Sequence, residues 1–403
     1  MADYVIVLAV AFGATFLLTP LVRRLAVRVG AVVAPGERRV HVLPMPTLGG
    51  VAMYAAFLLA MAVAWRLDHF DAAFAGSSEP LGVVLAATVI FGVGVLDDLR
   101  EVSAPAKMAG QVFAGSVLYL FGVTMFFFRV PYADIVVLSP DIAPLVTVLW
   151  VVGMANAVNL IDGLDGLAAG IVAIAAGAYF LYGERLVDVG LIGEDNISPL
   201  VAVIVVGVCL GFLPHNFHPG RIMMGDSGAL LLGMLMAAST MVVGGRTAES
   251  YSGQTFFFYA PLFIPFLILG VPMLDTLFAI VRRAKRRQKV TAPDKEHLHH
   301  RLMRLGHGQR RSVLILWAWT AILSGFVLYP AYTDEGNALV PFGIAALGVA
   351  LYTVLHPHAR RERNGEVPDD GGAPALAAGR TVSARGQTPA PPVVEGTSDG
   401  PQE

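Results

Sequence analysis

Apolar segments of helical length alternate with short polar segments along most of the chain. The apolar segments number about eleven and cover residues 4–22, 48–65, 81–96, 107–121, 142–159, 166–182, 198–214, 227–243, 256–281, 312–330 and 337–355. A run of about 20 apolar residues crosses a hydrocarbon core of about 30 Å as a helix. The pattern therefore predicts an all-α polytopic integral membrane protein with about eleven transmembrane helices.

Two segments depart from this pattern. Residues 122–138 (GVTMFFFRVPYADIVVL) alternate weakly and contain a proline, which favours a short β-hairpin over a span. Residues beyond about 360 are rich in Pro, Gly, Ala and Ser, a composition typical of disordered segments. We therefore predict a transmembrane domain over 1–358 with a short external hairpin, and a disordered cytoplasmic tail over 359–403.

Charged residues are scarce and unevenly distributed. Only 14% of the 403 residues are charged, compared with roughly 25% in a typical soluble domain. One set of alternate loops carries Arg23, Arg24, Arg28, Arg38, Arg39, Arg100, Arg221 and the basic stretches 282–289, 301–311 and 360–363. The other set carries only Arg66, Arg129, Arg185 and Arg246. Because short basic loops stay in the cytoplasm, this division predicts an external N-terminus and a cytoplasmic C-terminus.

Polar residues cluster in the loops that are predicted to be cytoplasmic. The clusters are HVLPMPTLGG (41–50), LDDLREVSAPAKMAGQ (96–111), NLIDGLDG (159–166), PHNFHPGRIMMGDSGALLLG (214–233) and APDKEHLHHRL (292–302). All of them are expected on one face of the membrane. If these loops converge, they form a site at the cytoplasmic membrane surface.

The adjacent carboxylates Asp97 and Asp98 end the third predicted span. Neighbouring residues of a helix point about 100° apart, so the two can serve two neighbouring targets, such as a metal ion and a second substrate. A solvated pair of loop residues is the simpler alternative.

Asn159, Asp162 and Asp165 recur every three residues. If this segment is helical, the three side chains share one face, with a drift of about 60° per step. Carboxylates this close to apolar spans mark functional sites, although aspartates also cap helix ends. We expect Asp162 and Asp165 to position a ligand rather than transfer protons, without the raised pKa of a buried acid.

Asp226, in MMGDSG, opens the eighth predicted span. Aspartate is a good N-cap residue and is also an oxygen ligand for Mg²⁺, and both roles can hold together. His297, His299 and His300 lie in a basic loop beside Lys295 and Arg301. These neighbouring cations favour binding of phosphate groups over binding of zinc. The wider stretch 282–311 also fits a topogenic loop that binds anionic lipids.

Together these residues supply carboxylates for a metal, cations for phosphates and a membrane location. Phosphoryl transfer uses this combination, because positioning and charge neutralisation dominate its catalysis. The membrane setting suggests that one substrate is a lipid. A secondary transporter is the rival class, but it predicts ionisable residues near mid-membrane and paired halves, and the sequence shows neither.

The motifs VLDDLR, NAVNLIDGLDGLAAG, GDSG and HLHHRL occur in this order. In them the chain resembles the polyprenyl-phosphate N-acetylhexosamine-1-phosphate transferase superfamily. The resemblance implies a Mg²⁺-dependent phosphotransferase, with Mn²⁺ as a substitute, in a bacterial cell membrane. Such enzymes transfer a sugar 1-phosphate from a UDP-sugar to polyprenyl phosphate and release UMP. Membrane lipids are the implied surroundings, no nucleic acid is implied, and a homodimer is left open.

The resemblance also implies roles for individual residues. Catalytic roles fall on the paired aspartates and the histidine motif, namely Asp97, Asp98, His297, His299 and His300. Metal binding falls on Asp226 and Asp98. Substrate-binding roles fall on Asn159, Asp162, Asp165, Asn216, Lys107 and Gln111.

Two departures bear on the branch of the superfamily, and two further positions bear on the nucleotide contacts. The peptidoglycan branch uses UDP-MurNAc-pentapeptide and has three consecutive histidines, whereas this chain has HLHHRL, and Val42 stands where that branch has a lysine. Both departures favour a UDP-GlcNAc:undecaprenyl-phosphate GlcNAc-1-phosphate transferase, with the phospho-MurNAc-pentapeptide transferase as the alternative. Ala34 and Met223 replace an Asp and an aromatic residue that are common in the favoured branch, which affects the expected nucleotide contacts.

Overall fold

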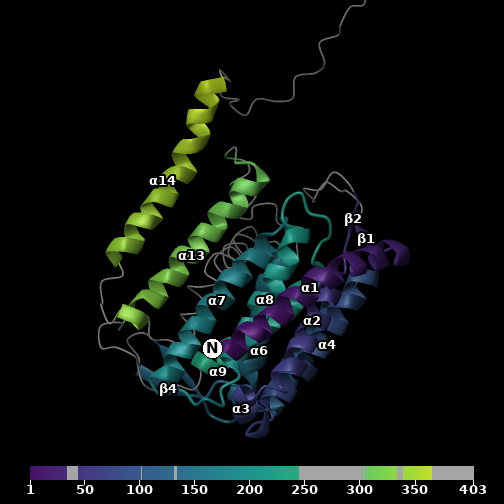
Figure 1. Cartoon of the computed structure of the whole chain (residues 1–403), viewed down its shortest axis with the longest axis vertical. Coiled ribbons are helices and arrows are strands. Elements are labelled where there is room, and N and C mark those ends of the chain that lie inside the picture. Colours follow the sequence, from purple (N-terminus) through teal and green to yellow (C-terminus); the bar gives the residue numbers. More distant parts are fainter. Residues whose placement is uncertain are drawn as a thin grey trace, which may run out of the picture. The chain divides into compact units, whose positions relative to one another are not determined.

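The computed structural model describes residues 1–33, 44–100, 102–130, 134–244, 302, 305, 307–333 and 339–364 (Figure 1). Residues 1–358 form one compact unit, and the fold below is that of this unit. The predicted span 256–281, the histidine motif, the branch positions 34 and 42, and nearly all of the predicted tail lie outside the described residues.

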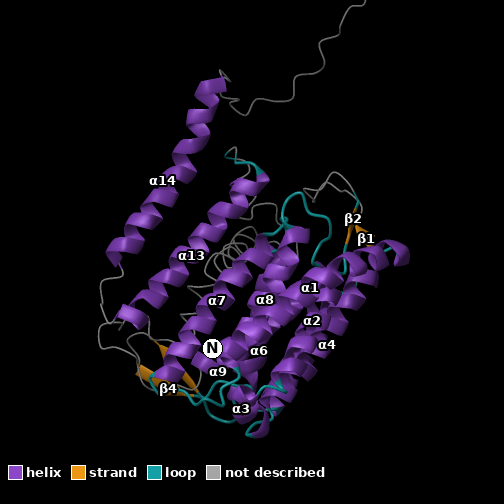
Figure 2. Cartoon of the chain, viewed as in Figure 1, coloured by secondary structure: helices purple, strands orange, loops and turns teal. Residues whose placement is uncertain are grey.

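Helices dominate the described part of the chain (Figure 2). They are α1 (Ala2–Val29), α2 (Gly49–Ala64), the short η1 (Asp68–Phe70) and α3 (Asp71–Ala75), α4 (Glu79–Arg100), α5 (Ala104–Leu120), α6 (Ala143–Ile161), α7 (Leu167–Asp188), α8 (Ser198–Asn216), α9 (Gly225–Gly244), α13 (Gln309–Thr333) and α14 (Leu339–Asn364). Each predicted span that falls in the described residues coincides with one of these helices.

The helices confirm a polytopic membrane protein. Seven of the described helices are long and apolar enough to cross a membrane, or up to eight if the pair around the 91° bend between α2 and α3 counts as one span. Helix α5 has only 17 residues, and the apolar part of α14 is likewise short. The total of eleven spans and the direction of the termini stay predictions.

Two small antiparallel pairs of strands accompany the helices. Strands β3 (Phe127–Val130) and β4 (Asp134–Val137) pair with Phe127 opposite Val137 and Val130 opposite Asp134, which confirms the predicted hairpin. Strands β1 (Val32–Val33) and β2 (Met45–Pro46) also pair. This second pair was not predicted, because two residues are too few to show an alternating pattern.

Helix α9 forms the centre of the bundle, where it packs against α4 and α6 and also contacts α2 and α8. In its most apolar stretch 94% of the residues are buried, compared with 28% in the corresponding stretch of α1. A helix that is apolar all round belongs in such a core. Helix α13 packs against α7 at the side of this bundle (Figure 1).

Glycines bring two helices against the first turn of α9. A Cβ atom at Gly50 would collide with the backbone nitrogen of Gly228, and one at Gly94 would collide with the backbone of Ser227. Small residues let helix backbones approach closely in membrane proteins. The start of α9 is therefore held in a fixed position between α2 and α4.

Candidate active site

Six helix ends meet at one end of the bundle. They are the C-terminal ends of α4, α6 and α8 and the N-terminal ends of α5, α7 and α9, and hydrogen bonds or ion pairs join them. The three polar clusters at 96–111, 159–166 and 214–233 are thereby brought together. The expected convergence of these loops is confirmed, whereas the cluster at 292–302 lies almost wholly outside the described residues.

Asp98 caps the N-terminus of α9 from a neighbouring helix. Its Oδ1 accepts a hydrogen bond from the backbone N–H of Asp226 at 2.8 Å, and its Oδ2 accepts one from the N–H of Ser227 at 3.1 Å. The hydroxyl groups of Ser227 and Thr47 also donate to this carboxylate, at 2.6 and 3.4 Å. First-turn N–H groups lack partners within their own helix, and a negative charge there is favourable. Asp98 therefore fixes the helix that carries Asp226.

Gly225 makes this capping arrangement sterically feasible. Its φ is +73°, a left-handed conformation that glycine adopts without strain. A Cβ atom at this position would lie 2.5 Å from Oδ2 of Asp98 and equally close to the hydroxyl of Thr47. The glycine of the GDSG motif is thus required both by its backbone conformation and by the approach of Asp98.

Lys107 joins the other two aspartates. Its ammonium group lies 2.9 Å from Oδ2 of Asp97 and also forms an ion pair with Asp226. The second oxygen of Asp97 accepts the backbone N–H of Val102 at 2.7 Å. The three charged side chains come from α4, α5 and α9 and are 16–26% exposed. Two carboxylates therefore converge on one cation at the edge of the protein interior.

This convergence fits a Mg²⁺ site. Mg²⁺ is commonly held by one or two carboxylates, with water and substrate phosphates as the other ligands. No cluster of three or more His, Cys, Asp or Glu side chains that could hold a metal occurs in the described part of the chain. Asp97 and Asp226 could hold the ion together. As a metal ligand, Asp97 suits the geometry better than the predicted Asp98. Both carboxylate oxygens of Asp98 already accept hydrogen bonds from α9 and Thr47.

Asp165 and Asn216 tie two loops together. Asp165 is buried, and its Oδ2 lies 3.0 Å from Nδ1 of His218 and accepts the N–H of Gly220 at 3.0 Å. Asn216, also buried, accepts the N–H of Gly166 at 2.9 Å and donates to the carbonyl of Ile222 at 3.0 Å. These two predicted substrate-binding residues therefore hold the loop after α6 against the loop before α9.

Asn159 and Asp162 differ from Asp165 in their surroundings. Both side chains are partly exposed, and neither forms a side-chain hydrogen bond within the described part of the chain. Helix α6 ends at Ile161, and Asp162 has non-helical backbone angles. The helical case considered for Asn159, Asp162 and Asp165 therefore does not hold, because α6 ends inside the motif.

The pKa of Asp162 also differs from the expectation. Although its side chain keeps some accessible surface, the surrounding protein shields it from bulk water and raises its pKa well above the ordinary value of a carboxyl group, and the negative charges of Asp98 and Asp165 raise it further. The expectation of an unshifted carboxyl was wrong at this position.

Gln111 serves as a link between helices. It is 1% exposed and forms a reciprocal amide pair with Asn156, at 2.6 Å and 3.4 Å, that joins α5 to α6. Sequence reasoning missed Asn156, Thr47, Ser227 and His218. An asparagine inside an apolar span was the available signal for Asn156, and the other three lie within the polar clusters that the sequence singled out.

The chain is similar to known proteins over most of its length. Residues 80–244, which carry the described aspartates and Lys107, match the family model described as Glycosyl transferase family 4. A decaprenyl-phosphate N-acetylglucosaminephosphotransferase of Mycolicibacterium smegmatis is 39% identical over 358 residues, which are 87% of each chain. The chain belongs to glycosyl transferase family 4. This finding confirms the superfamily indicated by the four motifs.

Other members of glycosyl transferase family 4 are similar over comparable lengths. A probable undecaprenyl-phosphate N-acetylglucosaminyl 1-phosphate transferase of Bacillus subtilis is 35% identical, covering 81% of this chain and 83% of that protein. A phospho-N-acetylmuramoyl-pentapeptide-transferase of Desulforudis audaxviator is 33% identical, covering 78% and 95%. The Mycolicibacterium smegmatis and Bacillus subtilis proteins, at 39% and 35%, are thus more identical to this chain than the Desulforudis audaxviator protein.

Proposed function

We propose that this protein transfers N-acetylglucosamine 1-phosphate from UDP-GlcNAc to a polyprenyl phosphate and releases UMP. The observation that carries the proposal is the convergence of Asp97 and Asp226 on Lys107 in a chain of this family. Two carboxylates that could hold a metal ion, beside one ammonium group, suit phosphoryl transfer, because neutralising phosphate charge dominates its catalysis. The choice of donor and acceptor rests on the names of relatives that are 35–39% identical over most of the chain.

The reaction exchanges one phosphorus–oxygen bond for another. An oxygen of the polyprenyl phosphate forms a bond to the phosphorus that carries the sugar, and the bond from that phosphorus to the bridging oxygen breaks. UMP leaves with the electron pair. This direct displacement needs no covalent enzyme intermediate, while a two-step route through an aspartyl-phosphate is the mechanistic alternative.

The residues of the site divide this work between them. Asp226 and Asp97 would hold Mg²⁺, which when bound neutralises charge on the diphosphate. Lys107 keeps both carboxylates close together and adds a positive charge beside the transferred phosphate. Asp98 acts as a positioning residue through the start of α9.

The remaining polar residues suit binding of the UDP-sugar. Asn159 and Asp162 present side chains that the described protein groups do not use. A carboxyl group with a raised pKa can donate a hydrogen bond as a neutral acid, so Asp162 can contact a polar group of the sugar or the nucleotide. Asp165 and Asn216 support these contacts by fixing the loops.

The site is proposed to face the cytoplasm of a bacterial cell, with eleven spans and an external N-terminus. The division of basic residues between alternate loops supports this direction. The reaction would then be the first membrane step in making a cell-wall or surface polysaccharide, because it attaches the first sugar to the lipid carrier.

UMP release by the purified protein tests the proposal. The assay contains UDP-GlcNAc, decaprenyl or undecaprenyl phosphate and Mg²⁺, with Asp226→Asn as the variant and Asp141→Asn, on an exposed loop residue, as its control. We expect turnover that requires the lipid, the metal and Asp226 but not Asp141. Turnover only with UDP-MurNAc-pentapeptide would overturn the choice of donor.

Absence of UMP release with both donors, in protein that is still folded, would overturn the reaction class. Uptake of a UDP-sugar by proteoliposomes would then favour the transporter.

A further inference from the structure

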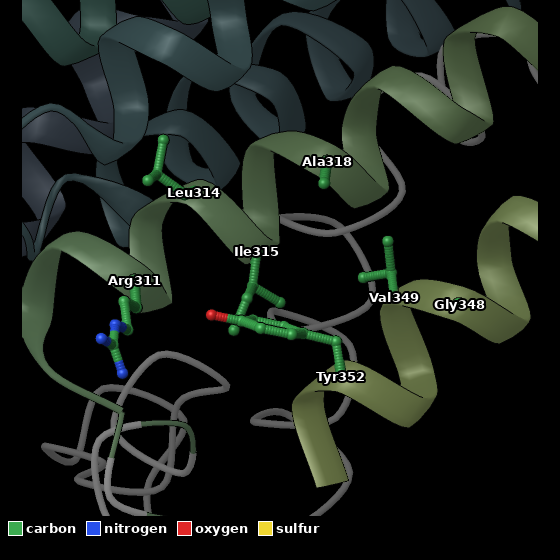
Figure 3. Close-up of a pocket in the computed structure, with 7 residues that line it drawn as sticks. All are labelled: Arg311, Leu314, Ile315, Ala318, Gly348, Val349 and Tyr352. Carbon is green, nitrogen blue, oxygen red and sulfur yellow. The ribbon is translucent and has the colours of Figure 1, made fainter. Parts of the chain in front are cut away.

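A cavity of about 220 Å³ lies between α13 and α14, apart from the aspartate site (Figure 3). Helix α13 lines it with Arg311, Leu314, Ile315 and Ala318, and helix α14 lines it with Gly348, Val349 and Tyr352. The ring of Tyr352 lies beside Ile315, and its hydroxyl is on the side of Arg311 (Figure 3). The cavity is thus apolar except at the end where these two polar groups lie.

Contacts on both sides of the cavity join the two helices. At one end the ring of Phe342 packs against Phe326 and Tyr329, with ring centroids 6.3 and 6.0 Å apart. At the other end the ring nitrogen Nε2 of His307 lies 2.8 Å from the carbonyl oxygen of Thr353. The cavity therefore lies between two points at which α13 and α14 are in contact.

Gly348 leaves the middle of the gap open. A Cβ atom there would meet no heavy atom within 4 Å. Leu314 and Leu351, on the two facing helices, are 50% and 48% exposed. Helix α13 is apolar enough to span a membrane, so exposed leucines of this kind face lipid chains rather than water. A lipid chain can therefore enter the gap from the side.

Arg311 makes the cavity favour a ligand with a negative charge. It lies in the first turns of α13, next to Arg310 and at the end of the basic stretch 301–311. Basic pockets between membrane helices bind anionic lipid headgroups, and a long arginine side chain can reach the interface from an apolar surface. A zwitterionic lipid would place a cation near this guanidinium, whereas an anionic phospholipid would not.

We propose that the cavity binds one acyl chain of an anionic phospholipid, with the lipid phosphate at Arg311. The inference does not depend on the transferase reaction. The bound lipid would fill the gap between α13 and α14 and stabilise the start of α13. That start reaches the active-site loops, because Nε of Arg310 donates a hydrogen bond to the carbonyl of His218 at 3.0 Å.

Native mass spectrometry of the full-length protein tests this site. The protein is delipidated in detergent and then titrated with phosphatidylglycerol or phosphatidylcholine. We expect one phosphatidylglycerol to bind at least about fivefold more tightly than phosphatidylcholine, which corresponds to about 1 kcal/mol. Arg311→Gln should abolish this preference, whereas Arg24→Gln, on an exposed arginine of α1, should keep it.

A pair of glycine variants tests the cavity itself. Gly348→Phe fills the gap and should reduce phosphatidylglycerol binding by about tenfold, the equivalent of about 1.4 kcal/mol. Gly343→Phe, also in α14 and also free of neighbours around a Cβ atom, should leave binding unchanged. Ala318→Leu fills the cavity from the α13 side and provides a second variant if Gly348→Phe does not fold.

Three results would overturn the proposal. The first is equal binding of the two phospholipids by the wild-type protein. The second is unchanged phosphatidylglycerol binding in Gly348→Phe and Ala318→Leu. The third is displacement of phosphatidylglycerol by stoichiometric polyprenyl phosphate, together with a raised KM for that lipid in Gly348→Phe, which would identify the occupant as a substrate.

Discussion

Ser227 donates two hydrogen bonds to the carboxylate of Asp98, one from its backbone N–H at 3.1 Å and one from its hydroxyl at 2.6 Å. The two residues lie on α4 and α9, and their pairing holds the first turn of α9, which carries Asp226. Asp98 therefore influences the reaction through the placement of a helix, which separates its role from that of its neighbour Asp97.

Asp98→Ala should lose both stability and activity. It leaves two first-turn N–H groups of α9 without an acceptor, at a cost of about 1–2 kcal/mol. Ser227→Ala removes one hydrogen bond and should cost about 1 kcal/mol. We expect kcat/KM to fall in parallel with the thermal inactivation midpoint of the two variants in detergent. Complete inactivity of Asp98→Ala at an unchanged midpoint would instead indicate direct contact with a substrate.

Lys107→Met should separate metal binding from turnover. The ammonium group lies where Asp97 and Asp226 converge, so its removal leaves two carboxylates without a counter-charge. We expect Mn²⁺ affinity, measured by paramagnetic resonance without substrate, to increase by about tenfold. Turnover should fall by about 100-fold, a typical loss for one group that stabilises a developing charge.

Arg100→Met serves as the control for Lys107→Met. Arg100→Met, on an exposed residue at the end of α4, should change neither Mn²⁺ affinity nor turnover. A lower Mn²⁺ affinity in Lys107→Met would show that the two carboxylates need the lysine to form a metal site.

Asp162→Asn should change how stability depends on pH. Because the folded state raises the pKa of Asp162, the folded protein binds this proton more tightly than the unfolded chain. Stability therefore falls as pH rises from the ordinary carboxyl pKa through the raised folded value. Asparagine removes this decrease, so the variant should be more stable than wild type above the folded pKa.

Thermal unfolding in metal-free buffer across a pH series measures this effect. Asp141→Asn, on an exposed residue before α6, should keep the wild-type pH dependence. An identical slope in Asp162→Asn and wild type would mean that the Asp162 carboxyl is solvated in the folded protein.

Asn216 and Asn159 should respond differently to alanine. Asn216→Ala leaves the N–H of Gly166 and the carbonyl of Ile222 without partners, and each unsatisfied buried group costs about 1–3 kcal/mol. Asn159→Ala breaks no side-chain hydrogen bond within the described residues. We expect the first variant to unfold at lower temperature, and the second to keep its stability while its KM for UDP-GlcNAc increases.

The spans could be predicted from the sequence because each one is a long apolar run, and α7 and α9 lie where that pattern placed them. The direction of individual side chains could not be predicted from the sequence. Adjacency indicates only that Asp97 and Asp98 diverge, whereas their actual partners, Lys107 and Ser227, depend on how α4, α5 and α9 pack. The predicted span 142–159 ends within two residues of the end of α6 at Ile161, but the three-residue spacing of Asn159, Asp162 and Asp165 was also compatible with a longer helix.

Cysteine labelling can determine the direction of the bundle. The only native cysteine, Cys209, is fully buried. Single exposed cysteines can therefore be introduced and labelled without background labelling of Cys209. Ser103→Cys lies at the aspartate end, and Glu194→Cys lies in the loop between α7 and α8 at the opposite end. In intact cells an impermeant maleimide should label only Glu194→Cys, and inverted vesicles should give the reverse. The opposite pattern would place the aspartates outside.

Asp98 and its partner at Asp226 are 128 residues apart in the chain. A ribosome adding about 5–20 residues per second needs on the order of ten seconds to synthesise the second after the first. During that interval α4 is already made, and the carboxylate of Asp98 must stay hydrated at the membrane surface. A truncated product that ends before α9 would leave this carboxylate without its three donors from α9, which distinguishes it chemically from a finished chain.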